Sequence, residues 1–377
     1  MRVLHLVAGA KWTGPAAVAI DQVRALRAAG IEAEIGFTAA SPLAQRFVSE
    51  GWARPMFSGG AAPAAFFRDV GRVSEKLERE GFDLLHAHAS HDHLVALAAA
   101  PRRGFPTVRS FHHARTLRAW VGMPWTARGS AGHVFSNGAI AEAFRSRFGA
   151  RGPSRVFSPV VDRDRFRPGS RDARLLESLG VPKDSFLVGT IGKIARGRGH
   201  DAAVRILSGT EDPSITILQV GKGNQEKDIR RLAESLGVGA RHFGAGYQEE
   251  RLPDLYRSMD AFLFTASGAD QGHRAVREAM ASGLPVVSLA IPGIEDARLP
   301  KGSGLVCPSE EEAAAALTFL RTHPEQRAAM GARARKESER FSAEAFAADA
   351  GAFYAEALEF WNNRKRKRVT MPLRETP

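Results

Sequence analysis

Two short segments of the chain combine cations, glycines and carboxylates in a pattern suited to binding a diphosphate. In the first, the run GTIGKIARGRGHD, Gly192 is followed by Lys193 and Arg198 before Gly199 begins a helical pattern. Backbone amides at a helix start, combined with cations, form a common phosphate-binding arrangement. Arginines on exposed loops are also common, so this segment alone leaves a plain surface loop open as the alternative.

The second segment places two carboxylates, Asp270 and Glu278, on either side of a predicted helix start. Carboxylate oxygens accept hydrogen bonds from sugar hydroxyls, and an acidic residue binds the ribose diol in other Rossmann-like sites. Between the two acids, Gly272, His273 and Arg274 offer donors at a helix N-terminus, where phosphate is favoured. For an isolated pair of acids, the alternative is a solvated pair held by neighbouring arginines.

Histidines lie near the predicted ends of two strands in the first half of the chain. His112, in the run SFHHART, could hydrogen-bond a reacting group near neutral pH, or be a surface histidine beside arginines. Four more, His86, His88, His91 and His93, fall within eight residues, and zinc accepts such ligands. The first two end a strand, whereas the other two begin a helix and point apart. We therefore expect a polar lining of the cleft and no metal site.

Basic residues are concentrated in the first part of the chain. The net charge is +12, residues 1–168 hold 23 Lys and Arg against 13 Asp and Glu, and no acid lies between Asp92 and Glu142. Arginines and tryptophans lie together in one part of this region: Arg115, Arg118, Trp120, Trp125 and Arg128. Basic and aromatic side chains together are typical of a membrane interface, so we expect an acceptor-binding or anionic-membrane face here. An arginine-rich composition, or a helix packed in the core, is the alternative.

Composition narrows the class of protein. A chain of 377 residues with 44% hydrophobic residues predicts two globular domains. The single cysteine, Cys307, fits a reducing compartment. No apolar run is long enough to span a membrane, and the N-terminus is a poor signal peptide, so a cytoplasmic protein is expected. Nucleic acid is not an expected partner, because base-stacking motifs and groove-reading modules are missing.

The elements that must position these residues follow an alternation of hydrophobic runs and helical patterns, which predicts parallel sheets covered by helices. The pattern starts with a strand at 3–7 and restarts with one at 186–191, after a Pro-, Asp- and Arg-rich crossing near 159–169. Two such doubly wound sheets direct the carboxyl ends of their strands toward a shared cleft. The expected divisions are a first domain at 1–165, a second at 170–343, a helix at 344–363 packing back on the first domain, and a basic, disordered tail at 364–377.

Taken together, these segments resemble the retaining glycosyltransferases of family 4. That family has a cationic pair R-x4-K, matched here by Lys193-x4-Arg198, and an acidic pair E-x7-E, matched by Asp270-x7-Glu278 running into EAMASGLPVV. Two further segments carry the resemblance: VFSPVVDRDRFRP at 156–168 and MDAFLFTAS at 259–267. The resemblance implies the α/β GT-B fold, with two Rossmann-like domains, a cleft between them and C-terminal helices crossing back to the first domain.

It also implies a reaction and a set of roles. The enzyme would move a sugar from a nucleotide diphosphate sugar, UDP- or GDP-linked, to a glycan or lipid-linked acceptor in cell-envelope polysaccharide or lipopolysaccharide synthesis, at the inner face of the plasma membrane and without a cofactor. The implied catalytic residues are His112, Lys193, Arg198 and Asp270. The implied donor-binding residues are Gly14, Gly192, Gly272, His273, Arg274 and Glu278.

Two departures from the family pattern bear on specificity. The Arg and Lys positions are exchanged, which keeps the charge but changes the contacts with phosphate. Lys193 offers a point charge where the family has the forked Arg, and Arg198 offers a fork where the family has Lys. The first acid is Asp270, one methylene shorter than the usual Glu, so we expect altered sugar selectivity or a shifted loop. The alternatives are an epimerase of nucleotide sugars with the same fold, a non-catalytic binder of membrane or nucleic acid, or an inactive relative.

Overall fold

The computed structural model describes most of the chain as two compact units. The described residues are 1–9, 14–39, 41–42, 44–47, 50–59, 62–100, 104–117, 123–149, 152–266, 273–291 and 302–370. One unit comprises Met1–Val160 with Ala343–Pro377, and the other Val161–Ser342. The crossings therefore lie at 160/161 and 342/343, where the sequence predicted them near 165–170 and 343.

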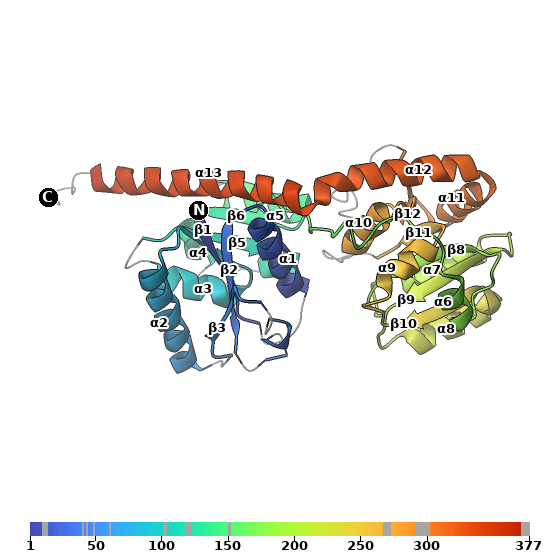
Figure 1. The fold of residues 1–377 in the computed structure, drawn as a ribbon, viewed down its shortest axis with the longest axis horizontal. Helices are drawn as coiled ribbons and strands as arrows, with labels where there is room; N and C mark the ends of the chain where they lie inside the picture. The colour runs from blue at the N-terminus through green and yellow to red at the C-terminus, as the bar shows by residue number, and fades with distance from the viewer. Residues whose placement is uncertain are drawn as a thin grey trace. The chain divides into compact units, whose positions relative to one another are not determined.

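The first unit is a parallel sheet in the order β3-β2-β1-β4-β5-β6-β7. Its strands are β1 (Arg2–Val7), β2 (Glu32–Thr38), β3 (Ala53–Phe57), β4 (Leu84–Ala87), β5 (Thr107–Phe111), β6 (Gly132–Phe135) and β7 (Ser154–Val156). Its helices are α1 (Gly14–Ala28), α2 (Pro63–Glu80), α3 (Ser90–Ala99), α4 (Met123–Gly129), α5 (Gly138–Phe148) and α13 (Ala343–Thr370) (Figure 1).

Helices cover both faces of this sheet because successive strand residues point to opposite sides. In β1, Val3 packs in one hydrophobic cluster with α1 and α13, while Leu4 packs in another with α2 and α3. Both side chains are fully buried. Fully burying a side chain of this size contributes about 1.5–3 kcal/mol, so the strand is secured from both sides.

Helix α13 is the last element of the chain, yet it belongs to the first unit. Phe353 and Tyr354 are fully buried in the cluster that also holds α1. The helix continues to Thr370, so the predicted helix end at 363 was wrong, as was a disordered tail for residues 364–370. Arg and Lys favour helix strongly enough to extend it. Trp361 Nε1 also donates to the Gly104 carbonyl at 2.9 Å, and Arg364 donates to the Arg128 carbonyl.

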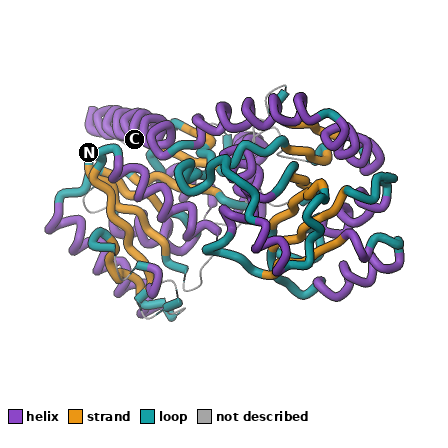
Figure 2. The backbone as a smooth tube through the Cα atoms, turned by 45° about the vertical axis from the view of Figure 1, so that its right-hand side comes forward, coloured by secondary structure: helices purple, strands orange, loops and turns teal. Residues whose placement is uncertain are grey.

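The second unit is a parallel sheet in the order β10-β9-β8-β11-β12-β13. Its strands are β8 (Phe186–Ile191), β9 (Ile215–Val220), β10 (His242–Gly246), β11 (Ala261–Phe264), β12 (Val286–Leu289) and β13 (Gly304–Cys307). Its helices are α6 (Ala173–Ser178), α7 (His200–Ser208), α8 (Glu226–Ser235), α9 (Leu252–Ser258), α10 (His273–Ala281), α11 (Glu310–Thr322) and α12 (Pro324–Glu337). Figure 2 shows the strands of each unit side by side with helices alongside them.

Each sheet has a point where the order of its strands reverses. In the first unit the reversal lies between β1 and β4, and in the second between β8 and β11. Ligands of such sheets bind beyond the carboxyl ends of the strands at this point, because the loops on either side diverge there. The α/β fold with two Rossmann-like domains is thus confirmed, and it places two loop pairs where a site can form.

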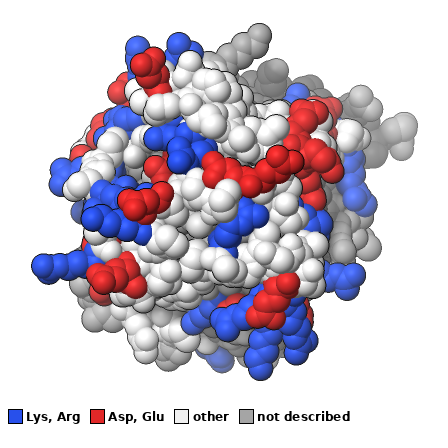
Figure 3. Space-filling model, turned by 90° about the vertical axis from the view of Figure 1, so that its right-hand side faces the viewer, with Lys and Arg blue, Asp and Glu red and all other residues white. Residues whose placement is uncertain are grey.

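The hydrophobicity of the helices and the distribution of charge on one face bear on contact with a membrane. Among the described residues, no helix has the length and apolar character needed to cross a membrane. On the face shown in Figure 3, basic and acidic side chains are interspersed rather than gathered into a field of one sign.

Candidate active site

The cationic loop predicted from the sequence follows β8 at the reversal point of the second sheet. Lys193 is exposed and Arg198 is half-buried. Gly199 adopts φ +72°, and a Cβ there would collide with the carbonyl group of Thr265. Thr265 Oγ1 in turn donates to the Gly199 carbonyl at 2.7 Å. The loop is therefore fixed against the residue that follows β11, and both cations lie beside the reversal point.

A glycine pair after β9 supports the same loop and was missed by sequence reasoning. A Cβ on Gly221 would collide with the Gly192 carbonyl, and one on Gly223 would collide with the Ile194 carbonyl. The Ile194 amide donates to the Lys222 carbonyl at 3.2 Å. The available signal was the position of Gly-Lys-Gly directly after a buried strand, where close backbone approach needs glycine.

Glu278 lies on α10 and is 5% exposed. Its Oε1 accepts from Arg274 Nε at 2.9 Å, and its Oε2 accepts from the Tyr256 hydroxyl at 3.1 Å. Burial, reinforced by the neighbouring carboxylate, raises the pKa of Tyr256 well above its usual value, so the phenol keeps its proton and donates. The carboxylate is held in one orientation with acceptor capacity remaining on both oxygens. Tyr256, on α9, was not predicted, because nothing in its sequence spacing relates it to Glu278.

One predicted catalytic residue, Asp270, and three predicted donor-binding residues fall at the edge of the described chain or outside it. Asp270 and Gly272 lie outside the described residues. His273 is the first residue of α10, and its side chain is outside the described part. Gly14 is the first residue of α1, which follows β1. The roles of these four residues stay predictions.

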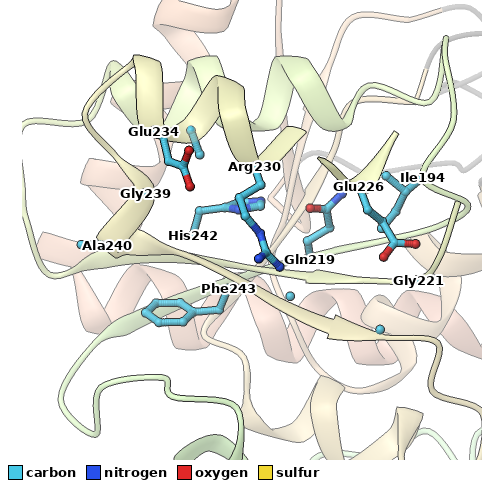
Figure 4. Close-up of a pocket in the computed structure, with 13 residues that line it drawn as sticks. Ile194, Gln219, Gly221, Glu226, Arg230, Glu234, Gly239, Ala240, His242 and Phe243 are labelled. Carbon is cyan, nitrogen blue, oxygen red and sulfur yellow. The ribbon is translucent and has the colours of Figure 1, made fainter. Parts of the chain in front are cut away.

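A cavity of about 500 Å³ lies along β10 and the carboxyl end of β9, and α8 lines its other side. Its lining comprises Ile194, Gln219, Gly221, Glu226, Arg230, Ala233, Glu234, Gly239, Ala240, His242, Phe243, Gly244 and Gly246. Figure 4 shows Gln219 and His242 from the strands grouped with Arg230 from α8. Gln219 is 4% exposed, and its Nε2 has no hydrogen-bond partner among the residues that the structure describes. Burial lowers the pKa of His242 to about 4, so this histidine is neutral. The cavity thus offers donors to a polar ligand.

In the first unit, the histidine cluster read from the sequence separates into two groups. His86 and His88 stack with ring centroids 4.4 Å apart. His91 is half-buried, and its Nε2 lies 3.5 Å from Asp69 Oδ2, while His93 Nε2 lies 2.9 Å from Ser130 Oγ. His86 and His88 thus lie together, and His91 and His93 point elsewhere.

His5, on β1, joins the first group and was missed because it lies 81 residues from His86 in a buried strand. Ligand atoms of His5, His86 and His88 lie within 4.8 Å of one another. The Tyr354 hydroxyl sits among them, 2.8 Å from His86 Nδ1 and 3.5 Å from His5 Nε2. His112, at the end of β5, is 7% exposed, and its Nε2 lies 3.2 Å from His88 Nδ1. The imidazoles are therefore engaged by hydrogen bonds among themselves and with a phenol.

The predicted basic-aromatic face is described only in part. Arg128, in the last turn of α4, is exposed. Arg118 and Trp120 lie outside the described residues, and so do the side chains of Arg115 and Trp125. The helical basic run of α13 reaches this region through the contact of Arg364 with the Arg128 carbonyl. A membrane or acceptor role for this face stays a prediction.

Comparison with known proteins matches both halves of the chain. A sequence model described as Glycosyltransferase Family 4 matches residues 12–165, and one described as Glycosyl transferases group 1 matches residues 172–337. The chain is 30% identical over 330 residues to D-inositol 3-phosphate glycosyltransferase of Rhodococcus erythropolis, covering 79% of this chain and 73% of that protein. The enzyme of that name from Rhodococcus opacus is 30% identical over 309 residues, covering 74% and 68%. The chain belongs to glycosyltransferase family 4.

Solved structures agree on the fold of this glycosyltransferase. Alr3699/HepE from Anabaena, in complex with UDP, superposes with a TM-score of 0.78 at 19% identity, covering 94% of this chain and 100% of that chain. A glycosyltransferase from Rickettsia africae superposes with a TM-score of 0.80 at 15% identity, covering 95% and 98%. The predicted GT-B fold is confirmed.

Within the glycosyltransferase, each unit thus brings its own candidates to its own reversal point. The second unit places Lys193 and Arg198 on the loop after β8, and Glu278 on the helix after β11. The first unit places His88 after β4, at its reversal point, and His112 after the neighbouring strand β5. These assignments come from the topology of parallel sheets, in which strand carboxyl ends share one edge.

Proposed function

We propose that this glycosyltransferase transfers a sugar from a nucleotide diphosphate sugar with retention of the anomeric configuration. The observation that carries the proposal is the placement of the Lys193–Arg198 loop and of Glu278 after adjacent strands at the reversal point of the second sheet. Cations there would face the diphosphate, and the fixed carboxylate would accept from the ribose diol. The Anabaena structures with UDP and with UDP-glucose support a UDP-linked donor over a GDP-linked one.

The nucleobase has a fitting place in the same unit. The cavity beside β9 and β10 adjoins the cationic loop through Ile194 and Gly221. The Gln219 amide, which has no partner within the described part of the chain, supplies a donor. A buried donor without a partner costs about 1–3 kcal/mol until a ligand satisfies it. We assign the base to this cavity.

The chemical step breaks the bond between the anomeric carbon and the donor phosphate oxygen, and the electron pair goes to the leaving diphosphate. Lys193 and Arg198 stabilise that developing charge, which is the largest contribution expected from such a site. The acceptor hydroxyl attacks the carbon from the face that the phosphate leaves, and its proton passes to a leaving phosphate oxygen. Exclusion of water would limit hydrolysis of the donor.

For the acceptor, the curated relatives favour a phosphorylated cyclitol over the envelope glycan expected from the sequence. The enzymes of Saccharomonospora viridis and both Rhodococcus species bear the name D-inositol 3-phosphate glycosyltransferase. The excess of basic residues in 1–168 suits an anionic acceptor. A glycan or lipid-linked acceptor is the second candidate, supported by the basic-aromatic region around Arg128.

Donor and acceptor are tested together. A thermal-shift panel of UDP-, GDP-, ADP- and dTDP-linked sugars identifies the donor, since a ligand of the folded state raises the melting temperature. Turnover is then measured with inositol phosphate, inositol and a glycolipid as acceptors, and NMR of the product reads the anomeric configuration. Interconversion of two nucleotide sugars without acceptor would replace the transferase with an epimerase, and an inverted product would remove the retaining mechanism.

Residue roles are tested in the cationic loop. We expect Lys193→Ala and Arg198→Ala to lower kcat/KM by about 10²–10³, because each removes charge stabilisation in the transition state. Arg196→Ala is the matched control, since Arg196 is an exposed cation of the same loop outside the motif. Turnover at the wild-type level in both test variants would remove these residues from the site.

A further inference from the structure

His112 ends a continuous row of hydrogen-bonded side chains inside the first unit. His112 Nε2 lies 3.2 Å from His88 Nδ1, and His88 Nε2 lies 2.9 Å from His5 Nδ1. The rings of His88 and His112 are stacked, as are those of His5 and His88. Each of these imidazoles is therefore engaged by the next through opposite ring nitrogens.

The row continues beyond His5 through the last helix of the chain. The Tyr354 hydroxyl, on α13, lies 3.5 Å from His5 Nε2 and 2.8 Å from His86 Nδ1. His86 Nε2 lies 2.7 Å from Ser110 Oγ on β5. We call this row the histidine relay, comprising Ser110, His86, Tyr354, His5, His88 and His112. All six side chains are at least 93% buried.

The direction of hydrogen bonding cannot change between Tyr354 and His112. Burial lowers the pKa of His5 to about 3, and burial also lowers the pKa values of His86 and His88 far below the usual value. A neutral imidazole has one N–H donor and one bare acceptor nitrogen, so His5 and His88 must each accept on one side if they donate on the other. This part of the relay therefore has two arrangements, set by whether the Tyr354 hydroxyl donates to His5 or accepts from it. The hydroxyl oxygen can also accept from both His5 and His86, so the bond between His86 and Ser110 does not fix the direction at His5.

The two arrangements differ at His112. In one, His88 donates to His112 Nε2, so the proton of a neutral His112 is on Nδ1. In the other, His112 donates from Nε2 to His88, and Nδ1 is a bare acceptor. Which ring nitrogen carries the proton is set by the bond that the other makes. The state of Nδ1 thus depends on the Tyr354 hydroxyl, two imidazoles away.

Two charged groups, Asp92 and Arg109, lie near the relay. Asp92 accepts from the amides of His88 and Ala89, at 3.1 and 2.7 Å, ahead of α3. Arg109 donates to Ser90 Oγ at 3.1 Å, while its Nε and Nη1 are buried without a partner among the described residues. The positive charge of Arg109 adds to burial in lowering the pKa values of His86 and His88, which favours their neutral forms.

We propose that Tyr354, His86, His5 and His88 are positioning residues that fix the tautomer of His112, so that its Nδ1 meets the substrate in a single protonation state. The inference rests on the proposed function in that His112 belongs to the active site. The relay makes the reacting region depend on a side chain of α13, far away in sequence. Loss of the relay changes the tautomer population of His112, and only one tautomer is competent.

The test reads the tautomer directly. Long-range ¹H–¹⁵N NMR of the full chain labelled in histidine distinguishes Nδ1–H from Nε2–H, with the His112 signal assigned from His112→Gln. We expect one tautomer of His112 in the wild type and a mixed or reversed population in Tyr354→Phe, which removes the hydroxyl and keeps the ring. Ser130→Ala is the matched control: it removes a buried hydroxyl 2.9 Å from His93, outside the relay, and should leave His112 unchanged.

Kinetics separates positioning from packing. With donor and acceptor in place, we expect Tyr354→Phe to lower kcat about 10-fold with little change in donor KM, as outer partners of a functional histidine commonly do. Ser130→Ala should keep wild-type kcat. If Tyr354→Phe fails to fold, His5→Gln breaks the row between Tyr354 and His88 and carries the same expectation.

The outcomes are distinguishable. An unchanged His112 tautomer in a folded relay variant overturns the inference, as does a changed tautomer with unchanged kcat. Absence of any transfer from nucleotide sugars overturns the proposed function, while the NMR result still reports whether the relay sets the tautomer.

Discussion

Acidification should weaken the first unit strongly, because four of its histidines are buried in the neutral form. Burial lowers the pKa of His5 to about 3 and the pKa values of His86, His88 and His93 far below the usual value. In the unfolded chain the same groups titrate near 6.5. Below about pH 6.5 the histidines of the unfolded chain bind protons, whereas the same histidines in the folded unit stay neutral. The free energy of unfolding of the first unit is therefore at its full value above about pH 6.5. It decreases as the pH falls from this value toward the pKa values of these histidines in the folded unit.

The magnitude follows from the proton uptake of the unfolded chain. Between pH 7.5 and 5.5, each neutral histidine costs the folded unit between about 1 and 2 kcal/mol, or about 5 kcal/mol for the four. Asp92 acts in the opposite sense: burial raises its pKa to about 6. The folded unit therefore gains a proton there before the unfolded chain does, which returns about 1 kcal/mol over this range. The net loss of about 4 kcal/mol is a large share of a typical domain stability of about 5–15 kcal/mol.

The chain offers a probe that sees only this unit. All five tryptophans lie within it: Trp12, Trp52, Trp120, Trp125 and Trp361. Urea unfolding followed by tryptophan fluorescence at pH 7.5 and 5.5 therefore measures the first unit even if the second unfolds separately. His93→Gln should reduce the loss by about 1 kcal/mol, whereas His323→Gln, on the exposed turn before α12, should leave it unchanged. A loss below about 1 kcal/mol in the wild type would refute neutral burial of these histidines.

Three further predictions concern the site. Glu278→Gln should raise donor KM about 10-fold with little change in kcat, because the ribose loses a charged acceptor; initial rates check this, and an unchanged KM would exclude the ribose contact. Asp270→Glu, one methylene longer, should change the ratio of kcat/KM among UDP-sugars; a constant ratio would separate this residue from sugar choice. The triple Ala variant of Arg115, Arg118 and Arg128 should lose salt-sensitive co-sedimentation with anionic liposomes, since each arginine near such a surface contributes about 1 kcal/mol. Equal binding of wild type to neutral liposomes would contradict a charged docking face.

Sequence reasoning predicted the place in the fold of those candidate residues that depend on one strand and the loop after it. Lys193 and Arg198 follow a buried strand, and Glu278 follows another in the next helical pattern. Because the strands are parallel, both loops had to emerge at one edge of the sheet. The reversal between β8 and β11 then brings them side by side, which the order of elements along the chain predicts.

Contacts between distant parts of the sequence could not be predicted in this way. Tyr354 lies 268 residues from His86, and its spacing within α13 is that of an ordinary buried residue. The sequence predicts only that His5 belongs to a strand, because it lies inside a hydrophobic run. Nothing in the sequence indicates which residues it contacts. The bond from Tyr256 to Glu278 joins two helices in the same manner. Such contacts depend on how elements pack, and a single sequence records only their local patterns.

The discontinuous first unit has a consequence for biosynthesis. The ribosome makes residues 1–160 first, but α13 emerges only after residues 161–342 have been synthesised. At about 5–20 residues per second, that interval lasts roughly 10–40 s. Throughout it, the apolar face that will cover Phe353 and Tyr354 is open to chaperones and to other nascent chains. The second unit is translated later, but all of its segments leave the ribosome before α13 does. The second unit can therefore complete its fold before the first unit, although the first unit begins earlier in the sequence.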